Sequence, residues 1–135
     1  MGILADQRFG QDALNAATGR GWWVGRPVEL PGSRPLRFDG TRSIGSALIH
    51  WPTEQVVKCL VHYHPDDEFS LRLAQEQTVL ELWEATRQSG NELLLEIIPP
   101  RALTPDGTAD AAVLRAVKRF YNLGVKPEWW KLAPM

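Results

Sequence analysis

Residues 56–63 read VVKCLVHY, and this stretch decides the fold class. It is apolar almost throughout, as expected of a strand that is covered on both faces within a parallel sheet. The pair His64-Pro65 ends the run, which is therefore too short for a helix. Two similar runs follow it, ELLLEII at 92–98 and EWWKLAP at 128–134. We therefore predict a strand at each of the three stretches.

Helical segments separate these strands. The first is predicted from Asp66 or Asp67 to about Gln88, and Gly90 ends it. Its core-facing candidates are large apolar residues, namely Phe69, Leu73, Leu80 and Trp83. The second is predicted from about Asp110 to Asn122. Its apolar residues at positions i, i+3 and i+7 are Leu114, Val117 and Tyr121.

The first half of the chain extends the same pattern. ILADQRFG at 3–10 reads as a short strand, and a brief helix is predicted from Asp12 to Thr18. A β-rich run at 22–30 and the loop PGSRPLRFDG at 31–40 follow, and Pro52 begins a short helical turn. Alternating strands and helices predict right-handed βαβ units in an α/β fold with a parallel sheet.

The composition narrows the class of protein further. Hydrophobic residues make up 44% and charged residues 23% of the chain, which is typical of a folded protein. The net charge of −1 gives no electrostatic reason to bind nucleic acid. Cys59 is the single cysteine, and neither a signal peptide nor a membrane span is recognisable. We therefore expect a cytoplasmic protein without nucleic-acid or membrane partners.

Three ionisable residues interrupt the apolar strands: Lys58, Glu96 and Lys131. Burying an isolated charge costs several kcal/mol, so each residue needs a partner or a function. Because side chains alternate along a strand, all three residues can point into a barrel interior, where a lysine can attack a carbonyl group. A structural salt-bridge network is an equally good interpretation. Cys59 should point to the opposite face as an inert thiol.

Two further groups of polar residues are candidates. His62 and His64, with Asp66 or Asp67, have the spacing of metal ligands, although a strand end followed by a helix cap is the favoured interpretation. The loop that contains Arg26, Glu29, Ser33 and Arg34 could bind a phosphate or carboxylate through its guanidinium groups, or it could be an exposed loop.

Long motifs in the chain suggest a family. ILADQRFG, WWVGRPVELPGSRPL, VVKCLVHYHPDD, LLLEIIPP and WWKLAP, in this order, resemble a domain of bacterial inositol catabolism that is fused to 5-dehydro-2-deoxygluconokinase. That domain is described as a 5-dehydro-2-deoxyphosphogluconate aldolase and is similar to the class I tagatose-bisphosphate aldolases. The resemblance covers essentially all 135 residues. It implies a lyase of carbohydrate metabolism with a TIM-type (β/α)8 barrel.

The resemblance also implies roles for single residues. Lys131 would be the Schiff-base lysine, Glu96 the general acid and base, and Lys58 a supporting cation. Asp6 would be an acidic residue at a strand end, and the substrate would be a phosphorylated keto sugar acid. The imine chemistry uses neither a cofactor nor a metal. The predicted substrate-binding residues are Asp6, Arg26, Glu29 and Arg34.

The mapping places residues 1–135 on strands two to six of the barrel, as one incomplete domain. A complete barrel usually needs about 250 residues. We therefore expect open sheet edges, which a kinase domain or a second copy of the chain would cover, and the chain by itself would be inactive. The other functions that we consider are a metal-dependent lyase or hydrolase that uses His62 and His64, and a structural module without catalysis.

Overall fold

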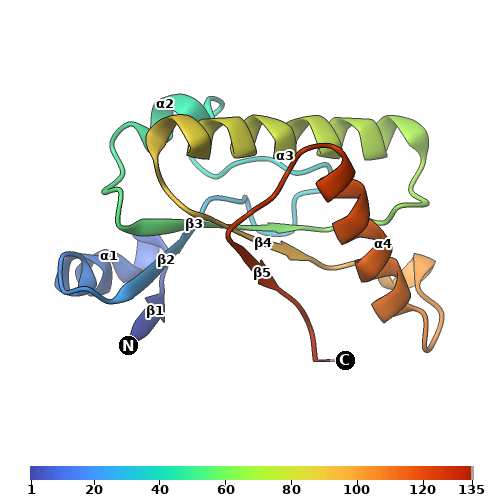
Figure 1. Ribbon diagram of the computed structural model, residues 1–135, viewed down its shortest axis with the longest axis horizontal. Coiled ribbons are helices and arrows are strands. Elements are labelled where there is room, and N and C mark those ends of the chain that lie inside the picture. Colours follow the sequence, from blue (N-terminus) through green and yellow to red (C-terminus); the bar gives the residue numbers. More distant parts are fainter. Residues whose placement is uncertain (135) are drawn as a thin grey trace.

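The computed structural model describes residues 1–134 and has a parallel sheet at its centre (Figure 1). The strands follow chain order across the sheet: Gly2–Leu4 (β1), Trp23–Pro27 (β2), Gln55–Val61 (β3), Leu93–Ile97 (β4) and Trp129–Lys131 (β5). The helices are Gln7–Ala17 (α1), Ile44–Leu48 (α2), Phe69–Ser89 (α3) and Ala109–Asn122 (α4), with a 3-10 turn at Arg101–Leu103. The five parallel strands curl into a half-barrel, which confirms the prediction of a partial β/α barrel.

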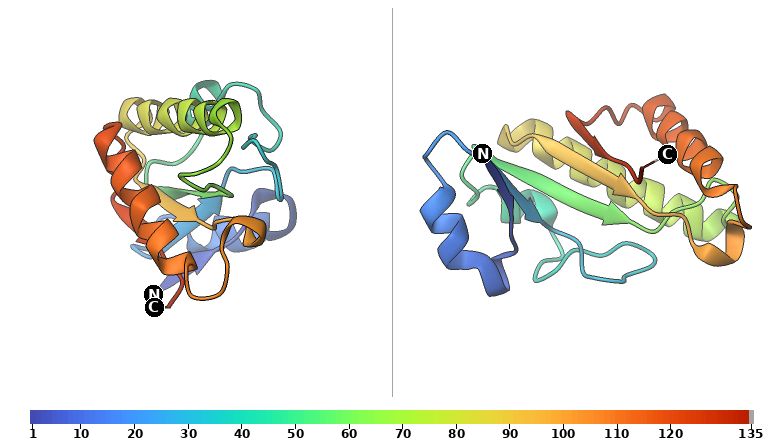
Figure 2. Two further views of the ribbon diagram at one scale, coloured as in Figure 1. Left: turned by 90° about the vertical axis from the view of Figure 1, so that its right-hand side faces the viewer. Right: turned by 90° about the horizontal axis from the view of Figure 1, so that it is seen from below.

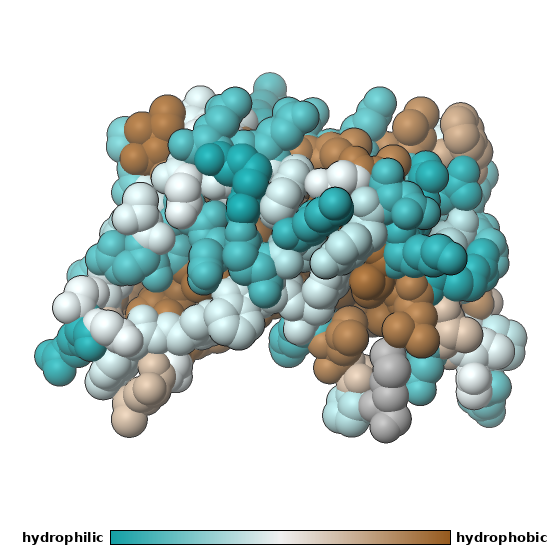
Figure 3. Space-filling view, in the orientation of Figure 1, coloured by the Kyte–Doolittle hydropathy of each residue, from teal (hydrophilic) through white to brown (hydrophobic). Residues whose placement is uncertain are grey.

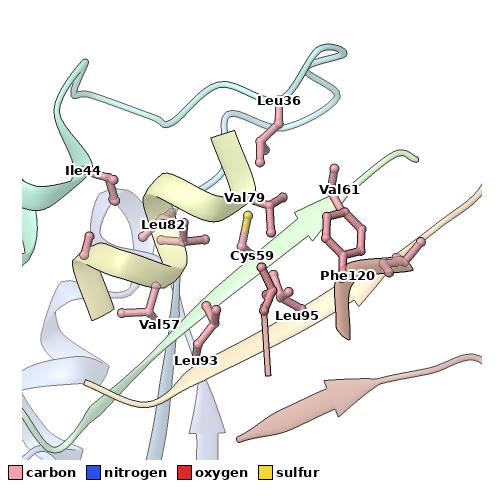
Figure 4. Close-up of a cluster of buried hydrophobic side chains, with 14 of the residues drawn as sticks. Leu36, Ile44, Val57, Cys59, Val61, Val79, Leu82, Leu93, Leu95 and Phe120 are labelled. Atoms are coloured by element: carbon pink, nitrogen blue, oxygen red, sulfur yellow. The ribbon is translucent and has the colours of Figure 1, made fainter. Parts of the chain in front are cut away.

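The two faces of the sheet have different neighbours. Val57, Cys59 and Val61 of β3 are fully buried against α3 and α4, together with their counterparts on β4 (Figure 4). Because side chains alternate, Lys58 lies on the other face, and the register places Leu94 beside it. We call this second face, which the helices do not cover, the concave face. The views in Figure 2 show the helices outside the curled sheet.

Two tryptophans show how strongly the sheet curls. Trp23 of β2 and Trp129 of β5 belong to strands that are not neighbours, yet their ring centroids are 6.1 Å apart in an edge-to-face contact. Gly25 makes room for this arrangement. A Cβ atom at Gly25 would lie 2.6 Å from Cη2 of Trp23, closer than two carbons can approach. The missing side chain therefore lets the Trp23 ring lie along the concave face.

The helices bury only part of the predicted set: Leu80, Trp83 and Val117 pack against the core and are partly buried, but the other four predicted residues are exposed. On α3, Phe69 and Leu73 are exposed, while Val79 and Leu82 are fully buried. On α4, Leu114 and Tyr121 are exposed. The buried residues of α4 are Ala112, Val113, Ala116 and Phe120. The prediction was wrong for those four residues because it followed the large apolar side chains, whereas alanines let α4 approach the sheet closely and Phe120 fills the space beside Tyr63.

Helix boundaries also differ from those predicted. α1 begins at Gln7 rather than Asp12, because the Asp6 carboxylate accepts a hydrogen bond from the Phe9 backbone N–H at 2.7 Å and caps the helix. α3 begins after Glu68, whose carboxylate caps it, rather than after Asp66 or Asp67. A turn follows Pro52 as predicted, with Gln55 N–H donating to the Pro52 carbonyl oxygen at 3.1 Å, and a short helix that was not predicted precedes it at Ile44–Leu48.

The surface is mostly polar around the long helix α3. Figure 3 shows hydrophilic side chains over this part and hydrophobic ones lower down, beside the C-terminal segment. Trp129 and Leu132, both in the C-terminal part of the chain, are large apolar residues that are exposed. None of the helices that the structure describes has the length and apolar character needed to cross a membrane.

Candidate functional site

Two lysine–carboxylate pairs occupy the concave face. Lys131 and Glu96 stand opposite each other in the register of β5 and β4, and Lys131 Nζ lies 2.9 Å from Glu96 Oε2. Lys58 Nζ donates a hydrogen bond to Glu29 Oε1 at 2.6 Å. The second pair is buried, since each of its side chains is only 10% exposed, whereas the Lys131 side chain is 54% exposed.

The sheet register explains why these residues share a face. Lys58 lies beside Leu94, and Glu96 is two residues farther along β4, so the side chains of Lys58, Leu94 and Glu96 point to the same side. Lys131 lies beside Glu96 and joins them. The chain stays extended after β2, where Val28 N–H donates to the Lys58 carbonyl oxygen at 3.0 Å, and this brings Glu29 to Lys58.

Three buried polar atoms around these pairs have no hydrogen-bond partner in the part of the chain that the structure describes. They are Trp23 Nε1, Glu29 Oε2 and Glu96 Oε2. Glu96 Oε2 is close to Lys131 Nζ, but the two atoms are not oriented as a hydrogen bond, so their contact is an ion pair. Native proteins rarely leave buried polar atoms unpaired. A polar ligand on the concave face would find both donors and acceptors here.

The sequence placed the three ionisable residues at strand ends, and the structure refines this. Lys131 is the last residue of β5, and Glu96 is the last but one of β4. Lys58 lies in the middle of β3, three residues before its end. The carboxyl ends of parallel strands form the edge where β/α folds bind ligands. The Lys131–Glu96 pair therefore lies at this edge, and the Lys58–Glu29 pair lies deeper on the concave face.

The predicted substrate-binding residues lie in two places: Asp6, Arg26 and Glu29 line one cleft, and Arg34 lies apart from it. Asp6 caps α1, and Arg26 points to the face of β2 opposite the lysines, where its guanidinium group stacks on Trp51 at 3.9 Å. Arg34 donates two hydrogen bonds to Asp67, at 2.8 and 3.0 Å, and lies away from the others. This hydrogen bonding raises the pKa of Arg34. Only Glu29 joins the lysines directly.

The histidine cluster is occupied by internal contacts. His64 Nδ1 accepts a hydrogen bond from the Asp66 backbone N–H at 2.9 Å, and Asp66 binds Arg115 through both carboxylate oxygens. Asp67 is bound by Arg34 and accepts from the His64 backbone N–H. Within residues 1–134, no group of three or more histidine, cysteine, aspartate or glutamate side chains is placed to hold a metal ion. The contacts fit the interpretation of a strand end followed by a turn.

Some features of the site were visible in the sequence and others were not. Cys59 is buried on the helix-covered face as expected, and burial raises its pKa well above the usual value. The pairing of Glu29 with Lys58 was missed, because it depends on a register that no local pattern encodes. The role of Trp23 was also missed, although its neighbour Gly25 inside a strand was a signal for close approach.

Comparison with known proteins gives a family for the chain. A search of the curated proteins finds no match. One family model matches residues 1–135, the full length of the sequence. The chain therefore belongs to the bacterial family described as "Uncharacterized protein conserved in bacteria (DUF2090)".

Proposed function

We propose that this protein is a Schiff-base aldolase-type lyase that cleaves a phosphorylated keto sugar acid. One observation carries the proposal: Lys131 and Glu96 come from neighbouring parallel strands, face the same concave side and lie 2.9 Å apart at the carboxyl edge of the sheet. The resemblance of the motifs to inositol-catabolism and tagatose-bisphosphate aldolases supports the same reaction. A metal-dependent reaction at His62 and His64 has less support, because their neighbouring carboxylates already bind arginines.

The proposed reaction begins with an imine. Glu96 accepts a proton from Lys131, and the free Nζ attacks the ketone carbon of the substrate. Glu96 donates this proton to the carbinolamine oxygen, which leaves as water, so that an iminium ion forms and Glu96 is a carboxylate again. Glu96 then takes the proton of the hydroxyl group on the β carbon. The bond between the α and β carbons breaks, its electron pair moves toward the iminium nitrogen to give an enamine, and an aldehyde leaves.

The second half of the reaction frees the lysine. The carboxylic acid of Glu96 returns its proton to the α carbon of the enamine, which becomes an iminium ion again. Water adds to the iminium carbon, the C–N bond breaks, and the second product leaves as a ketone. Lys131 is 54% exposed and can meet a substrate, whereas Lys58 is held by Glu29, so Lys131 is the better nucleophile.

The buried pair has a different part in this proposal. Lys58 and Glu29 fix opposite charges deep on the concave face, where Lys58 can orient an anionic oxygen of the substrate. β1 and β5 are the two edges of the sheet, and a kinase domain or a second copy of the chain would cover them. We place the protein in the cytoplasm, where its single cysteine would stay reduced.

Borohydride trapping tests the reaction. We would incubate the protein with dihydroxyacetone phosphate, a ketone phosphate of the kind such a cleavage releases, add sodium borohydride and measure the intact mass. The expected result is one covalent adduct that is absent from Lys131→Ala and retained in Lys126→Ala, a control lysine that lies over Tyr121. An adduct that persists in Lys131→Ala would contradict the assignment, and loss of turnover on chelation with no adduct would favour the metal reaction.

A further inference from the structure

A cleft of about 500 Å³ opens at the carboxyl ends of β1 and β2. The start of α1, the end of β2, the segment that follows it, and α2 with His50 and Trp51 line this cleft. Arg26 shares the sheet face of Val57, so its side chain is on the opposite side of β2 from Lys58. The volume falls within the range of small-molecule sites. The cleft therefore lies away from Lys131, although Glu29, which pairs with Lys58 on the concave face, also lines it.

Arg26 in this cleft lacks a charged partner. Its guanidinium group stacks on Trp51 at 3.9 Å and donates hydrogen bonds to the side-chain oxygens of Gln7 and Gln55, which are neutral. Arg26 forms no ion pair with any residue that the structure describes. Burial lowers its pKa, as expected of a cation that has lost water and gained no anion.

The stacking also fixes the orientation of this group. A guanidinium plane held against an aromatic ring has a fixed direction, and the two glutamines use only two of its five N–H groups, so others can donate to a ligand. Two glutamines add contacts from α1 and β3, so three elements position Arg26. By contrast, Arg34 donates two hydrogen bonds to Asp67, and Arg115 does the same to Asp66. The guanidinium group of Arg26 is therefore held in place without an anionic partner, and an anion from outside the chain could bind it.

We propose that this cleft binds the carboxylate group of a small polar ligand on the Arg26 guanidinium. The charges of the lining favour a monoanion. Arg8 pairs with Asp39 at 3.9 Å and Glu29 pairs with Lys58, so the guanidinium of Arg26 can neutralise one negative charge but not the two of a phosphate dianion. Hydroxyl groups of the ligand would face the polar side chains of Thr41 and His50. This site and the proposed lyase site stand independently of each other.

Acetate and its neutral isostere acetamide provide the test. We would titrate each into 15N-labelled protein at constant ionic strength and follow the Trp51 indole N–H and the Arg26 Nε–H. Acetate should give saturable shifts at both groups and acetamide should not. Arg26→Met should weaken acetate binding by at least about tenfold, the usual effect of losing a charge-assisted pair. Arg26→Lys, which keeps the charge but loses the planar fork, should also bind more weakly.

The controls separate this site from others. Arg20→Met removes another guanidinium over a tryptophan, Trp22 at 5.8 Å, outside the cleft, and should bind acetate as the parent protein does. Lys131→Ala should also bind acetate unchanged, so a failure of the lyase proposal leaves this one standing. Equal shifts with acetamide, unchanged affinity in both Arg26 variants, or tighter binding of inorganic phosphate than of acetate would overturn the proposal.

Discussion

The two lysine–carboxylate pairs on the concave face have the same charges but different surroundings. Lys58 and Glu29 are each 10% exposed, and a hydrogen bond of 2.6 Å joins them. Lys131 is 54% exposed, and its contact with Glu96 lacks hydrogen-bond geometry. A buried ion pair depends on both members, because either charge alone would be stranded. An open pair can exchange its partner for a substrate, so the same two charges would be structural at one position and reactive at the other if the proposed lyase reaction takes place.

Breaking each pair in turn should give the largest contrast. Lys58→Met leaves the Glu29 carboxylate buried without a cation, and we expect a loss of about 3–5 kcal/mol in the free energy of unfolding. Lys131→Met removes a half-exposed lysine but leaves the Glu96 carboxylate, which is 13% exposed, without its cation, so we expect a smaller loss of about 1–3 kcal/mol. Urea denaturation followed by circular dichroism measures both losses.

A double variant sharpens this contrast. Lys58→Met combined with Glu29→Leu removes both buried charges, and replacing such a pair by apolar side chains is often neutral. The double variant should therefore recover most of the stability that Lys58→Met loses. Equal losses in Lys58→Met and Lys131→Met would show that the two pairs do not differ as their exposure indicates.

Gly25→Ala tests the packing around the two pairs. The added methyl group would lie 2.6 Å from the Trp23 ring and 2.9 Å from Leu4 Cδ1, so the ring must move. We expect a loss of about 1–3 kcal/mol, as for other overpacked sites. The Trp23–Trp129 contact should also loosen, which near-ultraviolet circular dichroism would detect. Gly45→Ala, at a position where a Cβ meets no neighbour, is the matched control and should leave both signals unchanged.

The buried carboxylate of Glu76 should make the stability of the protein depend on pH. Burial alone would raise the pKa of Glu76, but hydrogen bonds from Arg119 and Tyr63 and the charges of Arg119 and Arg72 lower it below the usual 4.5. The unfolded chain then binds this proton more readily. The contribution of Glu76 to stability is present above pH 4.5 and is lost as the pH falls through the lower pKa that Glu76 has in the folded state.

The slope of stability against pH measures this contribution. One such group changes the free energy of unfolding by at most about 1.4 kcal/mol per pH unit. Unfolding should be followed from about pH 7 to about pH 3 in the parent protein and in Glu76→Gln, whose slope should be shallower. Parallel curves for the two proteins would show that Glu76 does not bind its proton differently in the folded and unfolded states.

The strands could be predicted from the sequence because their signals are local. Continuous apolar runs that end at proline, such as VVKCLVHY and LLLEII, mark buried strands without any knowledge of their neighbours. Alternation then placed Lys58 and Cys59 on opposite faces, and the structure agrees. The grouping of Lys58, Glu96 and Lys131 on one face follows from the same alternation and the parallel register.

The remaining features depend on contacts between distant residues. Arg34 binds Asp67, and Glu29 binds Lys58, across separations that no helical or strand period encodes. On α3 and α4, the size of an apolar side chain does not predict its burial: Leu82 and Phe120 are fully buried, whereas Phe69, Leu114 and Tyr121 are exposed. Arg26 was predicted to share a binding loop with Glu29 and Arg34; it lines a cleft with Glu29, but Arg34 lies apart and binds Asp67.

The order of the strands has a consequence for how the chain folds during synthesis. Each strand pairs with the one that precedes it, from β1 to β5, so every new βα unit meets its partner already made. Because β2 to β5 each pair with a strand that is synthesised before them, the sheet can grow from the N-terminus as the chain is made. The contact of Trp129 with Trp23 would then form last and report the completion of the curled sheet.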